Sequence, residues 1–105
     1  MDLSKFCVSA VAHERTFKFQ KEDCTLWFKE LPAIEFRRFH LAEQSTDEQK
    51  QVESMAKLIA ASACVDAKGK PAFTYAQALQ LSAAAANVLI GEVLAVNGFG
   101  KAGND

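Results

Sequence analysis

Hydrophobic positions recur at helical spacing at the beginning of the chain. They fall at i, i+3, i+4, i+7 and i+8: Leu3, Phe6, Cys7, Ala10 and Val11. This spacing is typical of one apolar face of a helix, and Asp2 is suited to cap its start. The pattern predicts a short N-terminal helix.

The pattern then changes from helical spacing to alternation. Residues 16–19 alternate polar and aromatic side chains, residues 20–23 are polar, and residues 25–29 are aromatic and β-prone. These three stretches predict a β-hairpin with its turn at 20–23. Leu26 and Phe28 are expected on one face and Trp27 on the other. Because two strands alone are marginally stable, we expect the hairpin to pack on helices.

A helix is predicted from Pro32 to about Glu43, because proline suits the first turn of a helix. Phe36 and Phe39 would share one of its faces.

The next helix is predicted to start at one of two overlapping capping boxes, Ser45 with Glu48 or Thr46 with Gln49. It should end near Cys64. Its apolar positions follow helical spacing: Val52, Met55, Ala56, Ile59, Ala60 and Ala63.

Residues 66–71 are predicted to form a turn, with Gly69 at positive φ and Asp66 accepting backbone hydrogen bonds. Residues 64–65 and 72–73 are candidates for a very short ribbon across this turn.

Two further helix starts and one helix end are predicted downstream. Thr74, with Gln77 as its partner in a capping box, should start a helix that breaks near Leu81. Ser82 should restart it. Asn97-Gly98 should end it in a Schellman motif, with Phe99 folding back onto the last turn.

The stretch from Pro71 to Gly100 carries a single charged residue, Glu92, whereas the first seventy residues hold eleven basic and eleven acidic ones. Its helix is apolar on more than one face and must be buried in a core or against a partner. We take a second copy as that partner and place self-association on four residues: Leu89, Ile90, Val93 and Leu94. For partner binding we single out Trp27 on the hairpin, with Phe36 and Phe39 on the helix that follows it. Tryptophan is enriched in binding hot spots, and a core position suits Trp27 equally well.

Length, charge and cysteine content limit the classes of protein to which the chain can belong. A chain of 105 residues suits one domain, residues 1–100, followed by a polar tail at 101–105. The net charge of −1 gives no basic stripe for nucleic acid. Neither a signal peptide nor a membrane span is predicted, and three widely spaced cysteines suit free thiols in a reducing cytosol. We therefore expect a soluble cytoplasmic domain of the α+β class, mainly α, in which an N-terminal helix and a small hairpin pack on three or four helices.

The sequence gives little support for a metal-binding or catalytic site. The zinc-ligating residue types Cys7, His13, Cys24 and His40 lack the tight pairs of structural zinc sites. A cysteine–histidine nucleophile needs only spatial proximity, but no supporting signature accompanies it. No catalytic, metal-binding or cofactor-binding residue is predicted.

Two basic stretches have simple structural explanations. Lys68-Gly69-Lys70 lacks the frame of a phosphate-binding loop and suits an ordinary turn. Arg37-Arg38 between Phe36 and Phe39 suits a core-facing phenylalanine pair with solvated arginines better than a single-strand nucleic-acid patch.

Several short motifs, taken in order, resemble the tail assembly chaperones of long-tailed (siphovirus-type) bacteriophages and prophages. An aromatic strand, Leu26–Leu31, leads into a phenylalanine-containing helix. The helix ending in Met55–Ser62 is followed by the acidic glycine turn Val65–Thr74, and an apolar helix ends in Asn97-Gly98-Phe99-Gly100. The resemblance covers about residues 24 to 100.

The resemblance implies a non-catalytic protein of the infected or lysogenic bacterial cytoplasm. Such proteins bind the tape measure protein, keep it soluble until tail tube subunits polymerise around it, and are absent from the mature virion. A longer form made by frameshifting recruits the major tail tube protein in many cases, and the proteins form homo-oligomers. Neither a cofactor nor a membrane or nucleic-acid partner is implied.

Two other classes stay open. One is a small intracellular oligomeric adaptor or regulator with no role in a phage. The other is a small metal or thiol enzyme that uses Cys7, Cys24 and the histidines.

Overall fold

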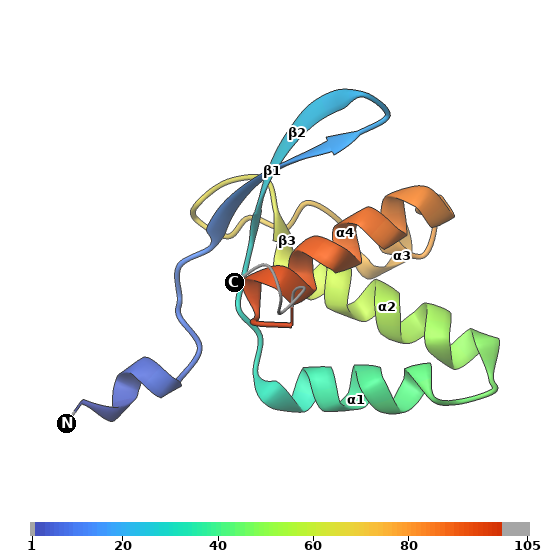
Figure 1. Ribbon diagram of the computed structural model, residues 1–105, viewed down its shortest axis with the longest axis horizontal. Helices are drawn as coiled ribbons and strands as arrows, with labels where there is room; N and C mark the ends of the chain where they lie inside the picture. Colours follow the sequence, from blue (N-terminus) through green and yellow to red (C-terminus); the bar gives the residue numbers. More distant parts are fainter. Residues whose placement is uncertain (1, 100–105) are drawn as a thin grey trace.

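The computed structural model describes residues 2–99 and consists of a small antiparallel sheet beside a group of helices (Figure 1). In chain order the elements are a 3₁₀ turn, two strands of a hairpin, two helices, a two-residue strand, a one-turn helix and a last helix. Their bounds are η1 Leu3–Phe6, β1 His13–Phe19, β2 Glu22–Phe28, α1 Ala33–Glu43, α2 Glu48–Ser62, β3 Ala63–Cys64, α3 Tyr75–Ala78 and α4 Ala83–Val96.

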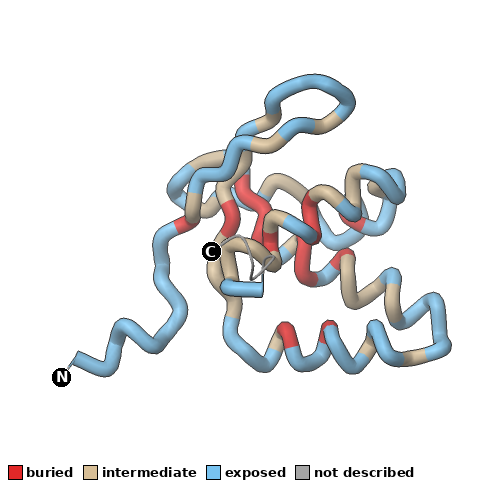
Figure 2. Tube along the Cα trace, in the orientation of Figure 1, coloured by how far each residue is buried: buried red, intermediate tan, exposed pale blue. Residues whose placement is uncertain are grey.

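The predicted N-terminal helix is wrong, and with it the predicted arrangement of the fold. Leu3–Phe6 is a single 3₁₀ turn whose Asp2 carboxylate accepts a hydrogen bond from the Ser4 amide at 3.0 Å. The hairpin strands precede the four α-helices, and no N-terminal helix packs beside them. Residues 2–11 are all exposed and extend away from the body (Figures 1 and 2). The polar tail predicted at 101–105 lies outside the described residues.

The hairpin is confirmed, with a tighter turn than predicted. Phe19 pairs with Glu22, so the turn has only two residues, Gln20 and Lys21. Both have positive φ, 53° and 69°, as a type I′ turn requires. Neither residue is the glycine or asparagine that usually marks such a turn, which explains why a longer turn was expected.

A third strand extends the sheet to the order β1-β2-β3. Trp27 pairs with Cys64, and the fully buried Ser62 hydroxyl donates to the Lys29 carbonyl at 2.8 Å. The short ribbon across the 66–71 turn forms slightly earlier than predicted, with a bridge between Cys64 and Pro71. As expected, Gly69 has a φ of 88°.

The helix ends follow local capping rules. Asp47, rather than Ser45 or Thr46, caps α2. Its carboxylate accepts hydrogen bonds from the backbone amides of Gln49 and Lys50, so both predicted capping boxes are wrong. The capping box of Thr74 and Gln77 is confirmed at α3, and Ser82 caps α4.

The predicted Schellman end of α4 is also confirmed. The Phe99 amide donates to the Leu94 carbonyl at 2.7 Å, the Gly98 amide to Ala95 at 3.2 Å, and Gly98 has a φ of 85°. The Phe99 ring, however, stacks on Phe36 of α1, with ring centroids 4.8 Å apart.

The core lies between one face of the sheet and the three longer helices. Its buried members come from β2, α1, α2, β3, α3 and α4: Phe28, Phe36, Phe39, Ala56, Leu58, Ile59, Ala63, Ala78, Leu89, Ile90 and Val93. Helix α2 contacts α1, α3 and α4, so it is the central helix of the group.

Candidate functional site

An apolar groove lies between the hairpin and the first turns of α4. It has a volume of about 440 Å³ and is lined by residues of β1, β2, α4 and the segments that flank α3. These residues are Phe17, Phe19, Cys24, Thr25, Leu26, Phe73, Leu81, Ala85, Val88 and Leu89. We call this surface the hairpin groove.

The two walls of the hairpin groove follow from the periods of their elements. Phe17 and Phe19 alternate along β1, and the strand register places Cys24 of β2 opposite Phe17 on the same face. Ala85, Val88 and Leu89 lie at i, i+3 and i+4 of α4, which is one face of the helix, and Leu81 directly precedes its cap Ser82. One face of the hairpin and one face of α4 therefore lie opposite each other, and the space between them stays open.

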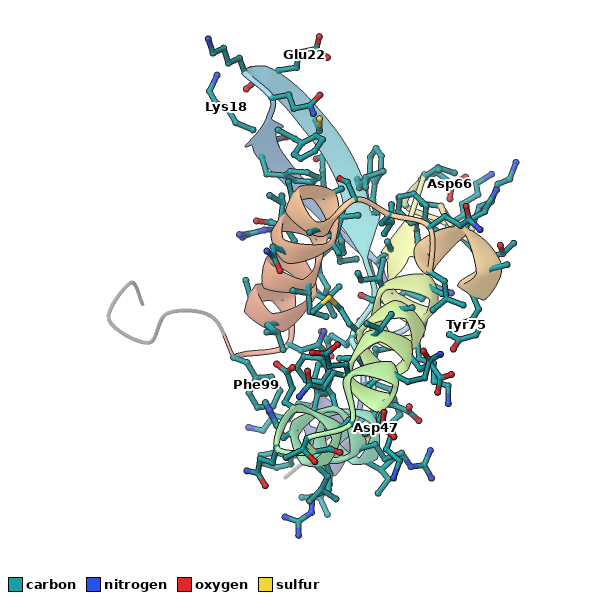
Figure 3. The ribbon with its side chains drawn as sticks, turned by 90° about the vertical axis from the view of Figure 1, so that its right-hand side faces the viewer. Lys18, Glu22, Asp47, Asp66, Tyr75 and Phe99 are labelled. Carbon is teal, nitrogen blue, oxygen red and sulfur yellow. The ribbon has the colours of Figure 1, made fainter. Side chains whose placement is uncertain are left out.

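The hairpin leaves this space open because its far end projects beyond the helices. Figure 3 shows the tip, marked by Lys18 and Glu22, standing clear of the helical group. The Lys18 ammonium and the Asp23 carboxylate are 3.1 Å apart near this tip and are both largely exposed. Charged groups thus surround the outer end of an apolar surface.

An ion pair connects the sheet to α4 at the inner end of the groove. Arg15 Nε donates to Glu92 Oε1 at 2.7 Å. Arg15 precedes Phe17 by two residues on the same strand face, and Glu92 follows Val88 by one helical turn. Glu92, the single charge of the apolar C-terminal stretch, therefore connects α4 to β1 of the hairpin.

The lining of the hairpin groove is poor in reactive groups. Its polar side chains are the Cys24 thiol and the Thr25 hydroxyl. Thr25 Oγ1 already pairs with Thr16 Oγ1 at 2.9 Å, and the Cys24 thiol lies 3.8 Å from the Glu22 carbonyl oxygen. These groups suit the burial of apolar side chains from a partner rather than proton transfer or nucleophilic attack.

The residues predicted for self-association lie mostly inside the chain. Leu89, Ile90 and Val93 are buried in the core, Val93 completely, and Leu94 is half-buried against it. The apolar surface that the sequence assigned to a second copy is thus covered by the sheet and by α2. Association through α4 would have to use its exposed side instead.

The three aromatic residues predicted for partner binding are not brought together on one surface. Phe36 and Phe39 are buried beneath α1, where Phe36 contacts Phe99. Trp27 is half-buried and lies on the sheet face opposite to Phe28, beside Cys64. Neither Trp27 nor the two phenylalanines line the hairpin groove.

The candidate zinc and thiol residues are also separate. His13 Nε2 pairs with Glu30 Oε2 at 2.8 Å, and the His40 ring stacks on Phe39 and Phe99. Within residues 2–99, no three His, Cys, Asp or Glu side chains lie close enough together to hold a metal ion. Burial raises the pKa of the Cys64 thiol, which disfavours the reactive thiolate.

The two basic stretches lie where their simple explanations place them. Asp66 Oδ1 accepts from the Lys68 and Lys70 amides at 3.0 and 3.2 Å, so the acidic side chain holds the basic turn. Arg37 and Arg38 are exposed on α1, and Arg38 pairs with Glu35 at 3.6 Å.

Sequence reasoning missed most of the residues that line the groove, including Phe19, Phe73, Leu81 and Val88. The alternation of Phe17 and Phe19 and the helical spacing of Leu81 and Val88 were visible, but which surfaces would remain uncovered was not. Which surfaces remain uncovered depends on how the hairpin is placed relative to α4. The Arg15–Glu92 pair connects these two elements.

The described part of the chain contains no helix with the length and apolar content needed to span a membrane. Comparisons of the chain with protein-family models, with curated proteins and with solved structures gave no match.

Proposed function

We propose that this protein is a non-catalytic chaperone of phage tail assembly that binds apolar helical segments of the tape measure protein in the hairpin groove. The observation that carries this proposal is the groove itself, an open apolar surface of about 440 Å³ with no charged residue in its lining. Its lining and the resemblance of the sequence to tail assembly chaperones point to the same kind of ligand.

The character of the lining favours an apolar helix over a small molecule. Small-molecule sites are also mostly apolar, and a small number of precisely placed, free polar groups fix the orientation of the ligand. The groove offers two, and the Thr25 hydroxyl is already hydrogen-bonded to Thr16. Grooves lined by aliphatic and aromatic side chains receive the apolar face of an amphipathic helix. A tape measure protein is a long, largely helical chain whose apolar surface is uncovered before assembly.

The remaining elements of the proposal rest on the resemblance. The protein acts in the host bacterial cytoplasm, forms homo-oligomers and is absent from the mature virion. A frameshifted longer form recruits the major tail tube protein. Weak binding at each groove, repeated over an oligomer, suits a long partner with many similar sites.

Co-expression with the tape measure protein tests the groove. The wild-type chain is expected to keep the tape measure soluble and to co-purify with it. Val88→Glu places a charge in the groove lining and should reduce binding at least tenfold, about 1.4 kcal/mol or more. Ala84→Glu is the matched control, because Ala84 is exposed on the same helix outside the lining.

Circular dichroism and thermal melts establish that both variants fold. If the wild-type chain leaves the tape measure insoluble, the chaperone function is wrong. If Val88→Glu binds as well as Ala84→Glu, the hairpin groove is not the binding surface.

The gene neighbourhood gives an independent test. A tail assembly chaperone gene should have an overlapping frame near its last codons, followed by a very long helical reading frame. A neighbourhood of metabolic genes without such a frame would favour the adaptor class instead.

A further inference from the structure

Strand β1 is the outer strand of the sheet, and its far edge is unpaired. The order β1-β2-β3 leaves β1 with one neighbour, whereas β2 is paired on both sides. Within residues 2–99, the backbone of His13–Phe19 makes no backbone hydrogen bond other than those to β2. Figure 1 shows β1 on the outside of the sheet, with β2 between it and β3.

The hairpin register determines which backbone groups face the free edge. In a two-residue hairpin the pair next to the turn, here Phe19 and Glu22, exchanges both hydrogen bonds, and bonded pairs then alternate along the ladder. The amides and carbonyls of Glu14, Thr16 and Lys18 consequently point away from β2. All three residues are exposed.

These three residues are self-complementary. In an antiparallel pair of two β1 strands centred on Thr16, Thr16 lies opposite its own copy and Glu14 lies opposite Lys18 on both sides. All three outward-facing residues would then occupy hydrogen-bonded positions. Each Glu14 carboxylate would face a Lys18 ammonium, which also lies 3.1 Å from Asp23 of its own hairpin. From this match we infer that β1 pairs with β1 of a second copy and joins the two sheets into one of six strands.

The alternating charges also act against other registers. A shift of two residues places Glu14 or Lys18 opposite Thr16, and a shift of four places like charges opposite each other. A parallel in-register pair would place Glu14 beside Glu14 and Lys18 beside Lys18. Charged residues on an edge strand usually prevent pairing, but here their signs select a single antiparallel register.

The resulting interface is isologous and closes as a two-fold dimer. It gives the proposed homo-oligomer a surface that the buried residues of α4 do not provide. The pairing uses the outer edge of β1 and does not require a partner in the hairpin groove, so dimerisation and tape measure binding can fail separately.

Charge reversal at Glu14 and Lys18 tests the register. Glu14→Lys and Lys18→Glu each place like charges opposite each other at both ends of the homodimer, and each should raise the dimer dissociation constant at least about tenfold. An equimolar mixture of the two variants should restore dimers as heterodimers, because every lysine then faces a glutamate. Glu43→Lys, a change of the same kind at the exposed end of α1, should leave the wild-type constant unchanged.

Sedimentation equilibrium measures the dimer constants, and native mass spectrometry identifies the heterodimer. Thr16→Pro supplies a second test, because it removes an outward-facing amide that is not used in the ladder with β2. It should give a monomer with native circular dichroism. A wild-type chain that stays monomeric at millimolar concentration overturns the inference, as does a folded Thr16→Pro variant that dimerises normally or a mixture that forms no heterodimer.

Discussion

The two ends of the described chain carry the same kind of apolar pattern and have opposite structures. Residues 3–11 and residues 89–96 both place large apolar side chains at helical spacing. The first segment is a single 3₁₀ turn followed by extended chain, and its Phe6 is 72% exposed. The second lies in α4, and its Val93 is completely buried. Helical spacing of apolar residues therefore predicts a helix reliably only where another element covers them.

Length and cover explain the difference between the two segments. Helix nucleation is unfavourable, so a segment of about nine residues gains little helical stability from local interactions alone. Helix α4 has fourteen residues, a side-chain cap at Ser82 and contacts with the sheet and α2. Within residues 2–99, no sheet face or helix buries the stripe of the N-terminal segment.

Both ends are attached to the same short connection between β2 and α1, again in different ways. At the C-terminal end, Asn97 Oδ1 accepts from the Leu31 amide at 2.8 Å, and Nδ2 donates to the Val93 carbonyl at 2.8 Å. At the N-terminal end, the Ser9 amide donates to Glu30 Oε1 at 2.9 Å. The first attachment satisfies main-chain groups in a partly buried place, and the second is exposed.

Removing apolar side chains from each segment should give the largest difference. Val93→Ala removes two methyl groups from a buried site and should lower the free energy of unfolding by about 2 kcal/mol. Phe6→Ala removes more apolar surface from an exposed site and should change it by less than about 0.5 kcal/mol. Urea unfolding followed by circular dichroism measures both.

Glutamate at Leu89 or Val93 separates a core role from an interface role. Because both residues are buried within one chain, we expect each variant to be unfolded. A folded, monomeric product would instead show that this face of α4 joins two copies, as the sequence alone suggested.

The elements with local capping signals were predicted well. Ser82 and the Thr74–Gln77 box mark helix starts through hydrogen bonds within a few residues of sequence, and Gly98 marks a helix end in the same way. Pro32 precedes α1 without a side-chain capping bond, and its fixed φ suits a helix start. The hairpin was predicted from alternation alone.

The capping boxes predicted for α2 were wrong for a local reason, since Asp47 is the cap instead of its neighbours Ser45 and Thr46. The missing N-terminal helix depends on distant parts of the chain, because within residues 2–99 no element buries its apolar stripe.

The candidate site was harder to predict than the fold. Phe36 and Phe39 were assigned to partner binding and Leu89 to self-association because they are large and apolar, and the same property places them in the core. The hairpin groove lies between the hairpin and α4, and the Arg15–Glu92 pair that spans these elements joins residues seventy-seven apart. Sequence spacing contains no signal for such a pair.

The Asn97 attachment should have an intermediate effect. Asn97→Ala leaves the Leu31 amide without its partner and should lower the free energy of unfolding by about 1–2 kcal/mol. Asn87→Ala is the matched control, since Asn87 is exposed on the same helix and should change stability little. Equal melting temperatures for the two variants would show that the Asn97 bonds do not stabilise the fold.

The smallest effect should come from the N-terminal attachment, and it should depend on pH. The bond from the Ser9 amide, with that from His13, lowers the pKa of Glu30 below its ordinary value. A carboxyl group whose pKa is lowered by folding stabilises the folded state above its ordinary pKa and loses that contribution as the pH falls through the lowered value. Acidification should therefore release Ser9, seen as a lower protection factor of its amide once the observed exchange rate is compared with the intrinsic rate at each pH. Global stability should change by about 0.5 kcal/mol or less, because Glu30 is accessible to solvent. Glu30→Gln should remove the acid transition from Ser9 and leave the amides of α4 protected. A Ser9 amide with the same protection factor at neutral and acidic pH would mean that Glu30 does not hold the N-terminal segment.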